Sequence, residues 1–256
     1  MREVENAQTI DFNCDLGEFT SPEGAADESA IFQWISSCNI ACGFHAGDVL
    51  SMELSMHRAI KHGVSIGAHP SFPDWEGFGR RHMDLSNDAL RICLYDQIAA
   101  ARNMAKTLHT HVAHVKPHGA LYHHLAADPI AARILLDVIE DFDPRMSVYG
   151  PFDSALHHLC LKSGQSFKVE AFADRRYCDD LTLMPRSEAS SLLPTSEAVA
   201  QAVELVIRKR VRTASGQWQH LQADTLCIHS DHQGAAFLAE RIHHELTQHG
   251  ILIASH

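Results

Sequence analysis

Short apolar runs alternate with longer amphipathic stretches along nearly the whole chain. The short runs have the length and composition of buried strands. We predict strands over residues 9–14, 38–42, 64–68, 112–116, 146–149, 167–171 and 225–229. A last apolar run, residues 251–254, either adds an eighth short strand or packs beneath the others.

The longer stretches have the spacing of amphipathic helices. In one of them Leu90, Leu94 and Ile98 recur at helical intervals. Asp128 followed by Pro129 is typical of a helix N-cap and the first helical position. We predict helices over residues 27–35, 51–61, 87–108, 129–141, 153–162, 196–208 and 233–248.

Seven strand-then-helix units without a hairpin signal indicate a parallel sheet in an α/β fold. Two architectures are compatible with this order, namely a closed barrel and an open, doubly wound sheet. The chain has 256 residues, a length that α/β barrels commonly reach as one domain. We therefore expect one domain over residues 1–256, and the positions of the polar residues decide between the two architectures.

Polar and ionisable residues directly follow six of the seven predicted strands. These segments are residues 13–18, 42–48, 67–81, 116–119, 170–175 and 229–231. A (β/α) barrel builds its active site at the C-terminal ends of several strands at once, whereas an open sheet gathers its ligands at one switch point. Contributions from nearly every strand favour a single-domain (β/α)7-type barrel with its site at this ring.

Taken singly, each of these residues has an ordinary structural explanation. Asp15 and Asp48 are suitable helix caps or turn residues, and a lone histidine is more often a buried or surface residue than a ligand. Four histidines, however, converge with several carboxylates on one predicted face of the barrel. They are His45, His69, His118 and His229. This joint pattern favours a functional site.

The charge balance limits the partners that the chain can bind. Lys and Arg number 21 and Asp and Glu number 32, so the formal net charge is -11 at pH 7. Such a surface repels nucleic acids and anionic membranes, and neither is an expected partner. No run approaches the roughly 18 apolar residues of a membrane-spanning helix. Residues 1–12 lack the apolar region of a signal peptide.

The motifs of several common protein classes are missing from the sequence. The seven cysteines are scattered and contain no CxxC pair, which indicates reduced thiols in the cytoplasm and neither a disulfide scaffold nor a zinc site of the CxxC type. No GxxxxGK[ST] phosphate loop is present, and no GxGxxG segment opens a helix after a strand. We therefore expect no standard nucleotide site on this chain.

Six segments carry a resemblance to a known family. They are NCDLGE (13–18), NIACGFHAGD (39–48), IGAHPSFPDWEGFGRR (66–81), VKPHGALY (115–122), EAFADRRY (170–177) and ADTLCIHSD (223–231). In this order they resemble the motifs of the LamB/YcsF family, and the resemblance extends over residues 10–253. It implies a fold related to the glycoside hydrolase and deacetylase (β/α)7 barrels, in agreement with the seven predicted strands.

The resemblance also implies a function, that of the A subunit of an ATP-dependent 5-oxoprolinase. This enzyme converts 5-oxo-L-proline (pyroglutamate), ATP and water into L-glutamate, ADP and phosphate. The family's chain acts with two partners, subunits B and C, to which ATP binding and phosphorylation of the lactam oxygen would then belong. The missing phosphate loop agrees with this division of labour.

Three positions depart from the usual pattern of the family. Ser230 and Leu181 stand where the family usually has glycine, and His123 stands where it usually has asparagine. None of these changes removes an ionisable group from the motifs. We expect Ser230 to narrow the site or to alter the φ of its loop, with consequences for substrate preference.

Opening an activated lactam requires attack by water on the carbonyl carbon and protonation of the ring nitrogen. The site therefore needs a general base, a general acid and groups that hold anions. Our hypothesis assigns the base or water-positioning role to Asp15 with His45 or His118, and anion binding to Lys116 and Arg80. The candidate catalytic residues are Asp15, His45, His69, Lys116, His118, Asp174 and His229. The candidate substrate-binding residues are Glu18, Asp48, Arg80, Glu170, Arg175 and Asp231.

Two interpretations of the histidines stay open. They can act by acid–base chemistry alone, or they can help to hold a divalent metal that activates water. In the second case the candidate ligands are Asp15, His45 and His118, with or without His69.

Two other functions also stay open. One is a stand-alone metal-dependent amidohydrolase or deacetylase, which would need a metal and no partner. The other is a non-catalytic subunit in lactam utilisation, for which alanine at His118 would leave the activity of the complex intact. The sequence is also compatible with a homo-oligomer.

Overall fold

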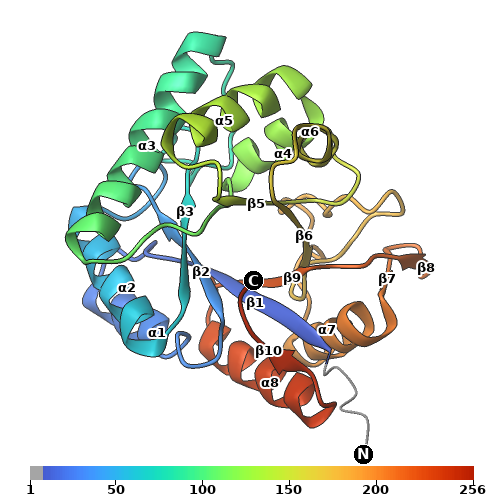
Figure 1. The fold of residues 1–256 in the computed structure, drawn as a ribbon. Helices are drawn as coiled ribbons and strands as arrows, with labels where there is room; N and C mark the ends of the chain where they lie inside the picture. The colour runs from blue at the N-terminus through green and yellow to red at the C-terminus, as the bar shows by residue number, and fades with distance from the viewer. Residues whose placement is uncertain (1–7) are drawn as a thin grey trace, which may run out of the picture.

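Seven parallel strands close into a barrel in the computed structural model of the chain, which describes residues 8–256 (Figure 1). They are β1 (Thr9–Leu16), β2 (Ser37–Ala41), β3 (Ser65–His69), β4 (His114–Val115), β5 (Ser147–Gly150), β6 (Phe167–Phe172) and β9 (Thr225–His229). Neighbours pair in this order, and β9 pairs with both β6 and β1, which closes the ring. The predicted closed barrel is confirmed, and every predicted strand is present with its ends shifted by no more than a residue or two.

Helices surround the barrel on its outer side (Figure 1). They are α1 (Pro22–Ser29), α2 (Val49–His62), α3 (Asn87–Thr107), α4 (Gly119–Ala127), α5 (Pro129–Phe142), α6 (Ala155–Ser163), α7 (Thr195–Arg208) and α8 (Ala235–Gln248). The predicted cap of α5 is confirmed, because the Asp128 side chain accepts hydrogen bonds from the backbone N–H groups of Ile130 and Ala131.

Two helices differ from the prediction. The predicted helix over residues 27–35 is wrong in its bounds, since α1 ends at Ser29 and is capped at its start by the hydroxyl of Ser21. The prediction missed α4, which begins directly after His118. Gly119 has a φ of +53°, and this left-handed turn lets the chain enter the helix with only three residues between the end of β4 and the helix start.

The predicted absence of hairpins is wrong in one place. β7 (Arg210–Arg212) and β8 (Trp218–His220) form a two-stranded antiparallel ribbon outside the barrel. The turn between them contains Ser215 and Gly216, a turn signal that the sequence prediction missed. β10 (Leu252–Ile253) pairs in parallel with the start of β1, which confirms the eighth-strand alternative for the last apolar run.

Two predictions concern membranes and export. Within residues 8–256, no helix combines the length and the apolar character needed to cross a bilayer. The prediction that the chain does not start with a signal peptide rests on residues 1–12, of which residues 1–7 lie outside the described part of the chain.

The interior of the barrel is polar at both ends of β1. Asp11, near the start of the strand, accepts hydrogen bonds from the hydroxyls of Ser37 at 2.5 Å, Tyr149 at 3.0 Å and Thr225 at 2.6 Å. This network satisfies a fully buried carboxylate and ties three strands to β1. Because side chains alternate along a strand, Asp11 and Asp15 share the interior face, and Asp15 lies near the opposite end.

Gly67 of β3 makes room for the ring of His114 inside the barrel. A Cβ at position 67 would lie 2.1 Å from Nε2 of His114. The ring has little freedom to move, because it stacks on Tyr149 at 4.0 Å and its Nε2 lies 2.8 Å from Oδ1 of Asn39.

We expect Gly67→Ala to lower the free energy of unfolding by about 1–3 kcal/mol, the usual cost of overpacking a core. Chemical denaturation measures this loss. In the double variant with His114→Ala, which frees the space, the total loss should be smaller than the sum of the single losses. Additive losses would contradict the clash.

Candidate functional site

A cavity of about 680 Å³ lies at the C-terminal ends of the barrel strands. Asp15, His69, Lys116 and His229 stand at or directly after the ends of four strands, and all four line the cavity. Residues from α4 and from the long loops after β3 and β6 complete the wall. The cavity therefore coincides with the ring of strand ends at which the sequence pattern placed the site.

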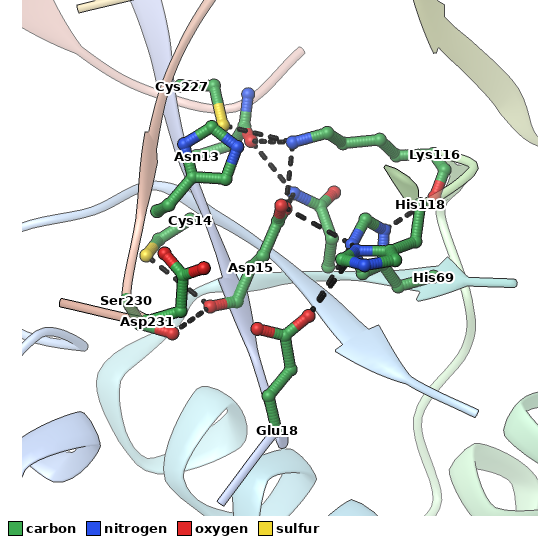
Figure 2. Close-up of polar contacts among 12 residues, drawn as sticks. Asn13, Cys14, Asp15, Glu18, His69, Lys116, His118, Cys227, Ser230 and Asp231 are labelled. Atoms are coloured by element: carbon green, nitrogen blue, oxygen red, sulfur yellow. Dashed lines mark hydrogen bonds and ion pairs between the residues drawn. The ribbon is translucent and has the colours of Figure 1, made fainter. Parts of the chain in front are cut away.

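Lys116 is a buried cation in this wall, with only 2% of the residue exposed. Its ammonium nitrogen lies 2.7 Å from Oδ1 of Asp15 and 2.9 Å from Sγ of Cys227 (Figure 2). It also lies 2.9 Å from Oε1 of Glu170. Burial alone would lower the pKa of Lys116, but its anionic neighbours, Asp15 foremost, hold that pKa well above its usual range. Lys116 is thus charged at neutral pH.

Asp15 connects this cation to the histidines. Its Oδ1 accepts hydrogen bonds from Lys116 and from the amide of Asn39 at 2.9 Å, and its Oδ2 lies 3.3 Å from Nε2 of His69. Burial alone would raise the pKa of Asp15, but the charges of His69 and Lys116 hold it well below its usual range. Asp15 is therefore a buried and ionised carboxylate.

Four donor side chains gather beside Asp15, and we call them the histidine–glutamate cluster. They are Glu18, His45, His69 and His118, and one donor atom from each lies within 4.8 Å of the others. Oε1 of Glu18 is 3.0 Å from Nε2 of His45, 3.5 Å from Nδ1 of His118 and 3.8 Å from Nε2 of His69. The three histidines are buried and Glu18 is partly buried (Figure 2 labels three of the four).

Backbone carbonyls fix the tautomers of two of these histidines. Nδ1 of His69 donates to the carbonyl of Lys116 at 2.6 Å, and Nε2 of His118 donates to the carbonyl of Phe78 at 2.9 Å. The remaining nitrogens, Nε2 of His69 and Nδ1 of His118, face each other at 2.9 Å. In neutral rings both carry lone pairs, which repel unless a proton or a cation lies between them. Nδ1 of His45 is also buried and has no hydrogen-bond partner among the described residues.

Burial disfavours protonation of two imidazoles in this cluster, those of His45 and His118. It lowers the pKa of His45 to about 4 and, with the charges of His45 and His69, holds the pKa of His118 well below its usual range. Burial, reinforced by the charge of Asp15, raises the pKa of Glu18 to about 7. Neutral imidazole is the form that binds metals, so the cluster is suited to a cation.

Two further ion-pair groups lie around the cavity. Asp174 accepts hydrogen bonds from Nδ1 and from the backbone N–H of His229, at 2.9 Å and 3.0 Å. Burial alone would raise the pKa of Asp174, but the charge and hydrogen bonds of His229 lower it to about 2. Asp231 pairs with Arg80 and, at 3.1 Å, with Arg186. These contacts join the loops that follow β3, β6 and β9.

One predicted substrate-binding residue, Asp48, does not line the cavity. Its side chain accepts the backbone N–H of Ser51 at 2.8 Å, and the hydroxyl of Ser51 accepts the backbone N–H of Asp48 at 2.6 Å. Asp48 therefore caps α2, which is its ordinary structural explanation. The other predicted residues line the cavity or contact a residue that does: Asp15, Glu18, His45, His69, Arg80, Lys116, His118, Glu170, Asp174, Arg175, His229 and Asp231.

The donor set that could hold a metal differs from the predicted one. The prediction named Asp15 with His45 and His118, with or without His69, whereas the structure groups these three histidines with Glu18 in place of Asp15. Asp15 lies beside the cluster, where an ammonium group neutralises its charge.

The sequence prediction missed residues that hold the site in place. The Asn39 amide donates to Oδ1 of Asn13 at 2.8 Å as well as to Asp15. Asn13 precedes Asp15 by two positions on one strand, so the alternation of side chains could have indicated its inward direction. Phe78 acts through its backbone carbonyl, for which the sequence has no signal.

The three departures from the family pattern have different structural consequences. Leu181 adopts a φ of +66°, the left-handed region that glycine enters without the cost of about 1–2 kcal/mol that other residues meet. Ser230 keeps an ordinary negative φ, and its hydroxyl donates to the carbonyl of Asp15 at 2.6 Å (Figure 2). His123 lines the cavity, and burial, followed by the charge of Arg175, lowers its pKa.

Comparison with known proteins gives one family and one fold. Residues 10–256 match the LamB/YcsF family. The chain is 41% identical over 250 residues to the A subunit of the 5-oxoprolinase of Methylococcus capsulatus, covering 97% of this chain and 96% of that protein. It is 33% identical to the lactam utilization protein of Thermus thermophilus, with a TM-score of 0.88 over 97% of this chain and 100% of that structure.

A more distant likeness concerns the fold alone. A family 4 carbohydrate esterase from Streptomyces lividans shares 10% identity and a TM-score of 0.50, covering 97% of this chain and 92% of that structure. The T48 deacetylase also shares 10% identity and a TM-score of 0.51, covering 97% of this chain and 88% of that structure, which confirms the predicted relation to deacetylase barrels.

Proposed function

The chain belongs to the LamB/YcsF family, and from this premise we propose that it is the A subunit of an ATP-dependent 5-oxoprolinase. The reaction converts 5-oxo-L-proline, ATP and water into L-glutamate, ADP and phosphate. The observation that carries the proposal is the buried pair of Asp15 and Lys116 at the wall of the cavity. It supplies an anion and a cation side by side, with Nε2 of His69 3.3 Å from the anion.

Three groups of the cavity wall have roles in opening an activated lactam. Asp15 is ionised, and its Oδ1 accepts the hydrogen bonds from the Asn39 amide and the Lys116 ammonium group. Oδ2 is therefore the oxygen that positions water or accepts its proton. Lys116 stabilises negative charge on the lactam oxygen or on a phosphoryl group carried by it. His229, oriented by Asp174, donates a proton to the leaving ring nitrogen through Nε2.

The reaction is divided among several chains in this proposal. We assign ATP binding and phosphorylation of the lactam to partner subunits B and C, since this sequence has no phosphate loop of the GxxxxGK[ST] type. We place the complex in the cytoplasm. The seven cysteines are free thiols and six of them are buried, which supports a reducing compartment.

The histidine–glutamate cluster fits a divalent metal ion. The support is the pair of facing lone pairs on His69 and His118, together with the unpartnered Nδ1 of His45. Metal-bound histidines usually donate their other ring N–H to a carbonyl or a carboxylate, as His69 and His118 do here. A divalent cation held by Glu18 and these three histidines would supply Lewis-acid chemistry at the cavity wall.

We expect the metal-free chain to bind about one equivalent of Zn²⁺ or Co²⁺ in a calorimetric titration. His45→Ala should weaken this binding at least about tenfold, because it removes a donor. His82→Ala is the matched control, since His82 lines the cavity outside the cluster. Equal affinities for His45→Ala and the unmodified chain would contradict the metal site and leave acid–base chemistry as the role of the histidines.

The same cluster favours one second candidate, a stand-alone metal-dependent amidohydrolase. A growth test separates the two functions. Cells without their own 5-oxoprolinase, supplied with 5-oxoproline as the only nitrogen source, should grow when this chain is expressed with subunits B and C. Cells with B and C alone should not grow. Growth without this chain would contradict the proposal, and amide hydrolysis by the metal-loaded chain alone would favour the second candidate.

A further inference from the structure

Arg175 is a buried cation in the cavity wall, with 4% of the residue exposed. Its Nε donates to the carbonyl of Ser191 at 3.4 Å, and its Nη2 donates to the carbonyl of Met184 at 2.6 Å. Within residues 8–256, no carboxylate oxygen lies within 4.0 Å of its guanidinium, and Nη1 makes no hydrogen bond. An arginine has five N–H donors, so Nη1 keeps donors without a protein partner in a residue that lines the cavity.

The carboxylates nearest to Arg175 are already engaged. Asp231 pairs with Arg186 and with a second arginine, and Asp174 pairs with His229. Burial, followed by the charge of Arg186, lowers the pKa of Arg175 to about 10, although both aspartates oppose this shift. The guanidinium is still charged at neutral pH. A buried charge without a counter-charge is unfavourable, which points to an anion supplied by a ligand.

The cavity lining contains two chemically different pairs of residues from different elements. Asp15 and Lys116 come from β1 and the residue after β4, whereas Arg175 and Arg186 come from the loop that follows β6. A small lactam that carries a carboxylate is oriented by this difference. The guanidinium attracts the carboxylate and Asp15 repels it, so the lactam ring is presented to the Asp15–Lys116 pair.

We propose that Arg175 binds the free carboxylate of the lactam substrate and so selects carboxylated lactams over neutral ones. This inference rests on the proposed function and adds the group that the substrate must carry. The planar guanidinium matches a carboxylate through parallel N–H donors. A phosphoryl group is also an anion that a guanidinium binds. The test distinguishes the substrate carboxylate from a phosphoryl group as the anion held by Arg175.

The test compares 5-oxoproline with 2-pyrrolidinone, the same ring without a carboxylate, in the complex with subunits B and C. We expect Arg175→Met to raise KM for 5-oxoproline about 10- to 100-fold, the effect of losing a charged hydrogen-bonded contact. The kcat should stay within about threefold, because substrate and transition state lose the same contact. Turnover of 2-pyrrolidinone should not change. Arg175→Lys should recover part of the affinity because it keeps a cation.

Arg176→Met is the matched control. Arg176 is the next residue, but it pairs with Glu197 at 3.2 Å and does not line the cavity. A second readout is the Kd of 5-oxoproline and of inorganic phosphate for the chain alone, measured by calorimetry. Circular dichroism and thermal melting confirm that each variant folds.

Unchanged KM and Kd for 5-oxoproline in folded Arg175→Met overturn the inference. Loss of phosphate binding with retained 5-oxoproline binding also overturns it, because the anion held by Arg175 is then the phosphoryl group. A wild-type complex that forms no glutamate rejects the proposed function instead. In that case the Kd values still decide whether Arg175 binds the carboxylate.

Discussion

Replacing Asp15 with asparagine is expected to lower kcat for glutamate formation by roughly a thousandfold. The variant keeps the shape of the side chain but removes the ionised carboxylate that lies between Lys116 and His69. General bases typically contribute about 10²- to 10⁴-fold to the rate. The measurement is steady-state glutamate formation by the complex with subunits B and C, with ATP and 5-oxoproline saturating.

Asp11→Asn is the matched control for this variant. Asp11 is equally buried on the same strand and is held by hydroxyl groups near the other end of the barrel. We expect it to lower the free energy of unfolding and to leave kcat nearly unchanged. If Asp15→Asn kept more than about a tenth of the wild-type kcat, Asp15 would not be the base or the water-positioning group.

Lys116→Met is expected to affect stability and catalysis together. Removing one partner of a buried ion pair costs about 3–5 kcal/mol in unfolding free energy, because Asp15 and Glu170 are left without their cation. We also expect kcat to fall by about 10²-fold or more, the size of effect seen when one group that stabilises transition-state charge is removed. Denaturant unfolding and glutamate formation measure the two losses.

A second substitution separates the two effects. In the double variant Lys116→Met with Glu170→Gln, one of the two carboxylates left without a cation is replaced by a neutral amide. Part of the lost unfolding free energy should therefore return. Activity should stay low, because the cation is still missing. Recovery of activity in parallel with stability would contradict the role of Lys116 in charge stabilisation and reduce it to a structural one.

The position of the site was predictable from the sequence because topology determines it. Asp15 and His69 directly follow predicted strands, and Lys116 and His229 end two others. Parallel strands in a barrel bring those ends to one face. No side-chain contact had to be known for this step. The apolar runs were also sufficient to predict the seven strands, because each strand is a short buried segment between longer amphipathic ones.

The directions of individual side chains were not predictable in the same way. Glu18 lies beyond the end of β1, and Gly17, with a φ of +76°, turns the chain so that the Glu18 carboxylate reaches His45. Asp48 has the same chemistry, but Ser51 three residues later forms a capping box with it and holds it at the start of α2. The pairing of each carboxylate depended on local turns that strand periodicity does not describe.

The most direct test of the central claim, that this chain carries the hydrolytic site of a 5-oxoprolinase, uses purified subunits. The measurement is glutamate formed per ADP by subunits B and C, supplied with 5-oxoproline and ATP, with and without this chain. We predict equal amounts of glutamate and ADP when the chain is present, and no glutamate when it is omitted. Glutamate formed without the chain, or ADP without glutamate from the assembled complex, would contradict the claim.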